Sequence, residues 1–361
     1  MEKLVTWVRT HRWETVSIGL GLSLVVLAVL LVVVAGDRDS GAEDDGGASP
    51  TTVAGEDSDE VFPPDVTTTN SAGGSPAVIG SGPFGGDTPI PVTAVVVDNV
   101  AGVGFQIGID QAPLLIEVPA ESGITRYIAF YGETIPELIG PVRSLRPVSA
   151  DLLALFSPVV FTTGGQPFVT GMVEGAGSII VTWGGSIAFQ TLERPQPHHV
   201  FVTPEVEGAL SEPAKAPWGY GEWGGGEPAT EVTIPIGGGI TWRFEDDVYA
   251  RYVGGERVDV LPEFEADPVP LTRDTLILLM ANQKSAGYTD SAGAEVPTFD
   301  VIGAGDLYVF HQGEVVEGRW FRSSQAGGYQ FVTQDGDRLP IPIGALYVAV
   351  VPAHLTIEVR G

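Results

Sequence analysis

The chain has 361 residues, of which 46 are acidic and 18 basic, so its formal net charge at pH 7 is −28. This charge argues against nucleic acid as a partner, because phosphate binding needs basic patches. The absence of cysteine excludes disulfides, thiolate zinc sites, a cysteine nucleophile and a lipid-modified cysteine anchor.

Residues 16–36 are predicted to form a transmembrane helix. The run VSIGLGLSLVVLAVLLVVVAG has no charge and no proline, and at 1.5 Å per residue it spans about 30 Å. Lys3, Arg9 and Arg12 precede it and an acidic segment follows, so the positive-inside rule keeps residues 1–15 in the cytoplasm. The sequence therefore predicts a single-pass protein of the cell membrane with an extracytoplasmic folded part. A cleaved signal peptide is the alternative, although this run is longer than an h-region of about 7–15 residues.

Residues 37–88 are predicted to be a disordered acidic linker. The segment is rich in Gly, Ser, Thr, Pro and acidic residues, and it has too little apolar content to bury a core. A flexible coil of about 50 residues has an end-to-end distance on the order of 40 Å. The linker would therefore hold the folded part away from the membrane.

Residues 89–228 are predicted to form a mixed α/β domain. Apolar runs predict strands at 93–99, within APLLIEVPAE and within GITRYIAFYG. The segment SADLLALFSP, residues 149–158, predicts a short helix with Ser149 as its N-cap. Two segments of similar build, PVVFTTGGQPF and SIIVTWGGSIAF, predict strands that end in glycine turns and pair either in parallel or as a hairpin.

Residues 229–361 are predicted to form a mainly antiparallel β domain. A Gly- and Pro-rich bridge around residues 212–238 marks the boundary between the two domains. Beyond it, alternating apolar and polar residues are broken by QG, GG and DG turns, a pattern typical of hairpins. The predicted fold class is therefore α+β, with one transmembrane helix and a disordered linker before the two domains.

Several blocks of the folded part resemble the DUF3048 family, also called YerB-like. The blocks are PVTAVVVDN, IEVPAESGITRYIAFY, IGPVRSLRP, PHHVFVTPEVEGAL, TWRFEDDVYARYVGG and GRWFRSS, and the resemblance covers residues 89–355. Three features depart from the family pattern: Ser122 stands where a glycine is usual, GGQPF replaces a Gly-Gly-Ser-Pro-like stretch, and the anchor is a helix in place of a lipidated cysteine. The resemblance implies a two-part extracytoplasmic protein of a Gram-positive bacterium, with a role around cell-wall synthesis and no assigned reaction.

Three arginines stand close together in this otherwise acidic chain: Arg126, Arg143 and Arg146. One interpretation is that they bind an anionic group of an envelope glycan, lipid or peptide, with Glu117 and Glu121 orienting them. The alternative is that the arginines pair internally with the glutamates and fasten the loop to the sheet. A glycosidase-like use of the two glutamates needs a turn between them, because residues four apart in a strand are separated by about 13 Å.

The sequence offers little for catalysis. The two histidines of PHHVF would point to opposite faces of a strand, so we expect no shared metal. Turn and packing contacts are the expected roles of this pair, and the alternative is that His198 lines the arginine site. We expect no cofactor either, since no Walker lysine or complete serine motif is present. The sequence therefore favours a binding or scaffold protein, with the membrane and an envelope protein or anionic wall component as partners. The alternative is an envelope hydrolase or phosphotransferase that uses the same cluster on a wall glycan or phosphate-bearing substrate.

Overall fold

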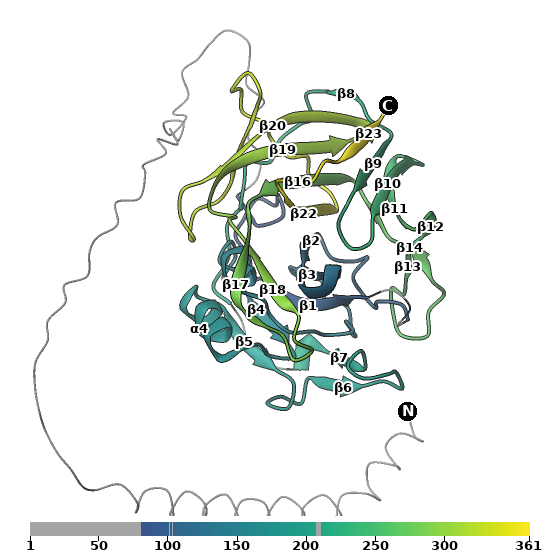
Figure 1. Ribbon diagram of the computed structural model, residues 1–361, viewed down its shortest axis with the longest axis vertical. Helices are drawn as coiled ribbons and strands as arrows, with labels where there is room; N and C mark the ends of the chain where they lie inside the picture. The colour runs from purple at the N-terminus through teal and green to yellow at the C-terminus, as the bar shows by residue number, and fades with distance from the viewer. Residues whose placement is uncertain (1–80, 101, 103, 207–210) are drawn as a thin grey trace, which may run out of the picture. The chain divides into compact units, whose positions relative to one another are not determined.

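The computed structural model describes residues 81–361, except 101, 103 and 207–210 (Figure 1). The predicted cytoplasmic tail, the predicted transmembrane helix and the predicted linker up to residue 80 lie outside the described residues. Within the described part of the chain, no helix is both long and apolar enough to cross a membrane. The chain already packs on the folded unit upstream of residue 89, where the Tyr220 hydroxyl donates a 2.8 Å hydrogen bond to the Pro83 carbonyl.

An 11-stranded sheet contains strands from both predicted domains (Figure 1). Its order is β21-β20-β19-β16-β22-β2-β3-β1-β4-β5, and β8 pairs with β20 outside this path. The strands are β1 (Thr93–Asn99), β2 (Leu114–Pro119), β3 (Thr125–Tyr131), β4 (Val159–Thr162), β5 (Ile179–Thr182), β8 (Glu227–Pro228), β16 (Thr275–Ala281), β19 (Gly303–His311), β20 (Glu314–Arg322), β21 (Gln330–Thr333) and β22 (Leu346–Pro352).

The two predicted domains meet in the middle of this sheet. Strand β22 pairs in parallel with β16 on one side and with β2 on the other, where Leu346 lies opposite Leu114. All seven residues of β22, LYVAVVP, are buried, as expected for a strand covered on both faces. The antiparallel prediction is confirmed for the pairs β16–β19, β19–β20 and β20–β21, but it is wrong for β22.

The N-terminal part of the sheet combines parallel and antiparallel strand pairs, within a described chain that is mostly β with few helices. Strand β1 is antiparallel to β3 and parallel to β4, and β4 is parallel to β5. The two segments with glycine turns therefore pair in parallel, one of the two predicted arrangements. Helix α4 (Pro167–Gly175) connects them, and the sequence analysis did not predict it because its sequence, PFVTGMVEG, is short and contains helix-weakening glycines.

The predicted helix at 149–158 exists, but its start was placed wrongly. Helix α3 (Pro147–Leu153) begins with Pro147 at its first position, and Arg146 is the N-cap. Proline suits this position because its missing N–H would have no partner in the first turn. Ser149 lies one turn further in, where its hydroxyl accepts a 3.1 Å hydrogen bond from the Arg146 backbone N–H.

A second, smaller sheet covers part of one face of the main sheet. Its strands are β9 (Glu231–Ile234), β10 (Ile240–Glu245), β11 (Val248–Val253), β12 (Glu256–Arg257), β15 (Thr272–Arg273) and β23 (Glu358–Arg360). Three two-stranded ribbons complete the strands: β6 (Phe189–Thr191) with β7 (Val200–Val202), β13 (Asp259–Val260) with β14 (Val269–Pro270), and β17 (Gln283–Thr289) with β18 (Glu295–Phe299). Two 3₁₀ turns, η1 (Glu121–Gly123) and η2 (Pro204–Val206), are also present.

Alternate residues of the main sheet serve two separate hydrophobic cores. On one face, Ile128 and Phe130 of β3 pack with residues of α3 and α4 such as Leu152 and Val173. On the other face, Tyr127 of β3 and its neighbours pack with the second sheet. Because side chains alternate along a strand, a polar residue's position in β1, β2 or β3 decides which of the two sides it faces.

Candidate functional site

The three arginines lie near one end of strands β1 and β3, together with three other polar side chains. We call this group the arginine cluster; its members are Asp98, Glu121, Arg126, Arg143, Arg146 and His198. It forms where β1 ends at Asn99, β3 begins at Thr125 and α3 begins at Pro147.

Glu121 holds two of the arginines. Its carboxylate accepts a 2.7 Å hydrogen bond from Arg126 and another from the Arg146 Nε, also at 2.7 Å, while Arg146 Nη2 makes a closer contact with it. The side chains of Glu121 and Arg126 are 6% and 3% exposed, so this contact excludes water. Arg126 also donates to the Ser144 carbonyl and Arg146 to the Leu145 carbonyl. For Arg126 and Arg146 the predicted alternative of internal pairing is therefore correct.

Burial and the neighbouring charges shift the pKa values of Glu121 and Arg126. Burial raises the pKa of Glu121, but Arg146 and Arg126 outweigh that effect and hold the pKa below its ordinary value. Burial, with the nearby charge of Arg146, lowers the pKa of the Arg126 guanidinium to about 9. Burial thus disfavours the charged form of Arg126, and the Glu121 carboxylate favours it.

Arg143 and His198 share a different carboxylate. Asp98 is fully buried at the end of β1, directly opposite Arg126 on β3. Its Oδ2 contacts His198 Nδ1 and lies 3.5 Å from Arg143 Nε, while its Oδ1 has no hydrogen-bond partner among the described residues. The Arg143 and His198 side chains are 18% and 14% exposed, so this end of the cluster reaches solvent. The structure thus places His198 beside Arg143, in line with the alternative expectation for this histidine.

Hydroxyl groups line the backbone next to Arg143. The Ser144 and Thr163 hydroxyls are 2.9 Å apart, and the Thr162 hydroxyl donates to the Arg143 carbonyl at 2.8 Å. Thr162 is the last residue of β4, so these groups lie beyond the carboxyl ends of the parallel strands β1 and β4. Open sheets of parallel strands commonly place ligands there.

Glu117 does not belong to the arginine cluster, and its predicted role as an orienter of the three arginines is wrong. It faces the opposite side of the sheet, since it lies opposite Tyr127 while Val118 lies opposite Arg126. Its carboxylate accepts bonds from Arg251 at 2.7 and 3.0 Å, and from the Tyr347 hydroxyl at 2.7 Å. Glu117 and Glu121 are therefore bound by different arginines on opposite sides of the sheet. A glycosidase-like pair of these two carboxylates has no support.

The partners of Glu117 come from both predicted domains. Thr125 and Asn99 also donate to its carboxylate, at 2.6 and 2.9 Å. The Arg251 guanidinium lies 5.4 to 5.9 Å from the ring centres of three aromatic residues: Tyr127, Trp242 and Tyr347. Burial lowers the pKa of Arg251, but the Glu117 carboxylate more than compensates and raises it above its ordinary value. This fully buried ion pair joins the two halves of the protein.

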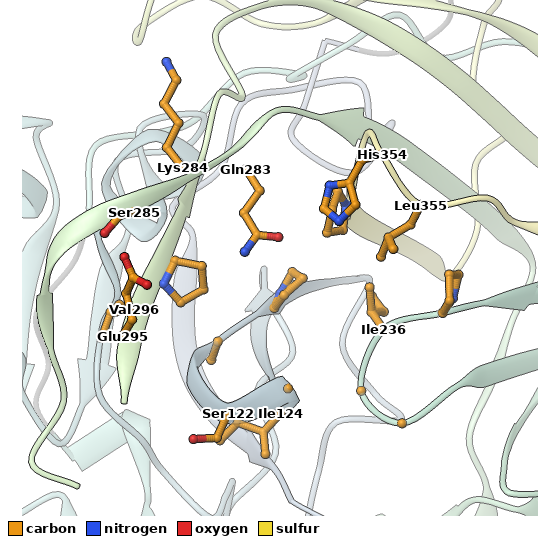
Figure 2. A pocket seen from close by; sticks show the side chains of 18 residues that line it. Ser122, Ile124, Ile236, Gln283, Lys284, Ser285, Glu295, Val296, His354 and Leu355 are labelled. Atoms are coloured by element: carbon orange, nitrogen blue, oxygen red, sulfur yellow. The ribbon is translucent and has the colours of Figure 1, made fainter. Parts of the chain in front are cut away.

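Two cavities lie on either side of the turn between β2 and β3. The first has a volume of about 770 Å³ and is lined by that turn, by the β9–β10 turn, by the β17–β18 hairpin and by residues after β22 (Figure 2). We call it the proline cleft, after Pro119, Pro235, Pro297 and Pro352 in its walls. The second, of about 630 Å³, reaches Asn99, Gln106 and Arg251. The three clustered arginines line neither of these two cavities.

The described residues hold no group of three or more His, Asp or Glu side chains that could bind a metal ion. His198 and His199 point to different neighbours: His198 contacts Asp98, and the His199 ring packs edge-on against Trp183 at 5.4 Å.

Comparison with known proteins identifies the family of this chain. Models of the family described as protein of unknown function (DUF3048) match the chain twice, the N-terminal domain at residues 85–215 and the C-terminal domain at residues 233–348. The chain belongs to the DUF3048 family. The resemblance seen in the sequence blocks is thereby confirmed.

One relative is similar over most of its length. YerB of Bacillus subtilis (strain 168), which is named "Putative lipoprotein YerB", is 24% identical over 275 residues, covering 72% of this chain and 80% of YerB. The crystal structure of the B. subtilis YerB protein has a TM-score of 0.63 and 21% sequence identity, and the match covers 76% of this chain and 95% of the crystallised chain. The fold described here is therefore that of a DUF3048 protein.

Two residues of these polar groups were missed by sequence reasoning. Asp98 ends the apolar run of β1, and its acidic character directly before Asn99 could have marked it as a polar residue at a strand end. Arg251 follows the buried Tyr249 and Ala250 in β11, where an arginine in a core-facing position signals a buried partner. Nothing in the sequence indicates that this partner is Glu117, 134 residues earlier.

Proposed function

We propose that this DUF3048 protein is a membrane-anchored extracytoplasmic binding or scaffold protein of the cell envelope, linked to cell-wall synthesis. The charge pattern of residues 1–36 and the lipoprotein name of its relative YerB support an attachment to the membrane. Its proposed ligand is an anionic component of the envelope, bound at Arg143 and His198.

The observation that carries this proposal is the charge of the arginine cluster. It contains three guanidinium groups and only two carboxylates, so one positive charge is left uncompensated when His198 is neutral. Glu121 is occupied by two arginines, and Arg143 touches Asp98 only through Nε at 3.5 Å. The outer nitrogens of Arg143 are therefore available to a carboxylate or phosphate, which guanidinium groups bind in a bidentate manner.

Thermal unfolding of the full-length chain in detergent tests this proposal. The probes are inorganic phosphate, muropeptides and phosphate-bearing wall polymers. A ligand present at one hundred times its dissociation constant should add about 2.7 kcal/mol to the stability. We expect one of these anions to stabilise the wild type and not Arg143→Gln. Arg319→Gln, which removes the same charge from an exposed strand position, should respond like the wild type.

Two results would count against the anion site. The first is that no anion of the panel raises the unfolding temperature of the wild type. The second is that an anion stabilises Arg143→Gln as much as the wild type, which would place its binding elsewhere on the molecule.

The Asp98–His198 contact favours one further candidate, an envelope hydrolase or phosphotransferase. A buried carboxylate that contacts Nδ1 of a histidine leaves Nε2 free to exchange protons with a substrate, as in catalytic triads. Release of phosphate or of glycan fragments from the same probes, lost in His198→Gln, would support this function. Binding without turnover in the wild type would leave the binding protein as the better account.

A further inference from the structure

The proline cleft is a separate candidate site, formed by segments from both halves of the chain. The β17–β18 hairpin forms one wall, and His354 with Leu355, which follow β22, form the wall opposite (Figure 2). The turn that carries Ser122 and Ile124 lies between them (Figure 2). A volume of about 770 Å³ is within the range of ligand pockets in proteins.

The walls of this cleft favour a ligand rich in N–H donors. Proline has no backbone N–H, so the four prolines offer only carbonyl oxygens as hydrogen-bonding groups, and the Pro352 carbonyl already accepts a bond from the Leu355 N–H. The other wall residues include the aliphatic Ile124, Ile236, Val296 and Leu355 and the polar Ser122, Gln283, Lys284, Ser285, Glu295 and His354. None of the described residues that line the cleft is Phe, Tyr or Trp, and His354 carries the one aromatic ring among them, so a sugar ring or a nucleobase finds little surface for stacking.

The charge of the cleft is negative. Lys284 extends away from the centre in Figure 2, and its ammonium lies 2.7 Å from the Asp300 carboxylate, so its charge is already compensated. Glu295, on the neighbouring strand, is exposed and makes no ion pair or side-chain hydrogen bond with the described residues. Phosphate is therefore disfavoured, and a ligand with a positive charge is favoured.

One polar side chain reaches across the opening. Gln283 extends from the hairpin toward the turn that carries Ser122 (Figure 2), and its amide makes no hydrogen bond to the described residues. A free amide can donate to a peptide carbonyl and accept from a peptide N–H at the same time. The cleft thus combines proline carbonyl oxygens, walls of mixed aliphatic and polar side chains, one free amide and one free carboxylate.

From these features we propose that the proline cleft binds a short extended peptide that carries a primary amine. The peptide backbone would bond to Gln283 and to the wall carbonyls, and the ammonium group would pair with Glu295. This site does not depend on the anion site, because the two have no lining residue in common. Arg143→Gln should accordingly leave peptide binding unchanged, so that either site can fail without the other.

Fluorescence anisotropy with two labelled pentapeptides tests the proposal on the full-length chain in detergent. The first probe is Ala-Ala-Lys-Ala-Ala with fluorescein on its N-terminus, and the second is the same peptide with an acetylated lysine side chain. We expect the lysine peptide to bind about two- to fivefold more tightly than its acetylated counterpart, the size expected for one exposed charge pair. An N-acetylglucosamine trisaccharide should not displace either probe.

Variants locate the binding. Glu295→Gln should abolish the preference for the lysine peptide, and Glu317→Gln, an exposed strand glutamate on β20, should keep it. Gln283→Ala should weaken both peptides alike, and unfolding temperatures of the variants confirm that they are folded. The proposal is overturned if the wild type binds neither peptide up to about 1 mM, which corresponds to −4.1 kcal/mol. It is equally overturned if Glu295→Gln retains the preference or if the trisaccharide competes.

Discussion

Replacing Glu117 by glutamine should destabilise the protein strongly, because it leaves a buried guanidinium without its counter-charge. Glu117 is 0% exposed and Arg251 is 1% exposed, so water cannot replace the lost carboxylate. The amide N–H₂ group of glutamine would also face the N–H donors of Arg251 in place of an acceptor. Breaking a buried ion pair in this way costs about 3–5 kcal/mol.

The double variant Glu117→Gln with Arg251→Met separates the charge from the shape of the site. Methionine removes the unpaired charge and keeps apolar volume beside Trp242, while the glutamine carbonyl still accepts from the Tyr347 hydroxyl. The double variant should therefore recover most of the stability lost in the single variant. Glu358→Gln, at an exposed glutamate 4.0 Å from Arg360, is a matched control for which the expected change is below about 1 kcal/mol.

Thermal unfolding of the full-length chain in detergent, followed by tryptophan fluorescence, measures these effects. At roughly 2 °C per kcal/mol for a protein of this size, Glu117→Gln should lower the midpoint by about 6–10 °C. The reasoning is refuted if the midpoint falls no further than in Glu358→Gln, or if the double variant is less stable than the single one.

Three further changes test other contacts. Glu121→Gln should lower stability most at neutral pH and least in acid. The pKa of Glu121 is held below its ordinary value of 4.5, so the stability that its carboxylate contributes is present above that pH and is lost as the pH falls through the lowered pKa. Unfolding midpoints of the variant and the wild type at pH 7 and pH 4 measure this difference. Arg322→Lys should cost about 1–3 kcal/mol because an ammonium cannot bridge the carbonyls that the guanidinium joins, whereas Arg319→Lys on the same strand should be neutral in the same melts. Gly318→Ala should cost about 1–3 kcal/mol, since its Cβ would lie 2.0 Å from the Val332 carbonyl, whereas Gly171→Ala has open space on α4 and should gain about 0.5–1 kcal/mol by urea unfolding.

The local structure around the arginine cluster could be predicted from sequence where short-range signals are strong. The run TAVVVDN gave the bounds of β1 correctly, because an apolar segment and a polar turn fix both ends of a buried strand. The start of α3 was misjudged because Ser149 resembles an N-cap, while Pro147 two residues earlier already has the backbone angle of a first helical residue.

The polar contacts were predictable only in part. The closeness of Arg126 and Arg146 follows from their short separation in sequence, and Glu121 is near them in the chain as well. The face on which Glu117 lies could not be derived, since it depends on the turn after Pro119 and on the register of β2 with β3. Its partner Arg251 is fixed by packing between distant strands, which single-sequence patterns do not report.

The central place of β22 has a consequence for how the chain reaches its native state. Glu117 and Tyr347, whose side chains bond within the core, are 230 residues apart in sequence. Closing so long a loop is entropically costly and makes folding slow, and β2 and β16 have no common neighbour until the chain beyond residue 346 has been synthesised. A chain that ends before Leu346 is therefore not a smaller version of this protein: it contains two partial sheets, each with an open edge where β22 should lie, and such edges are sites of aggregation.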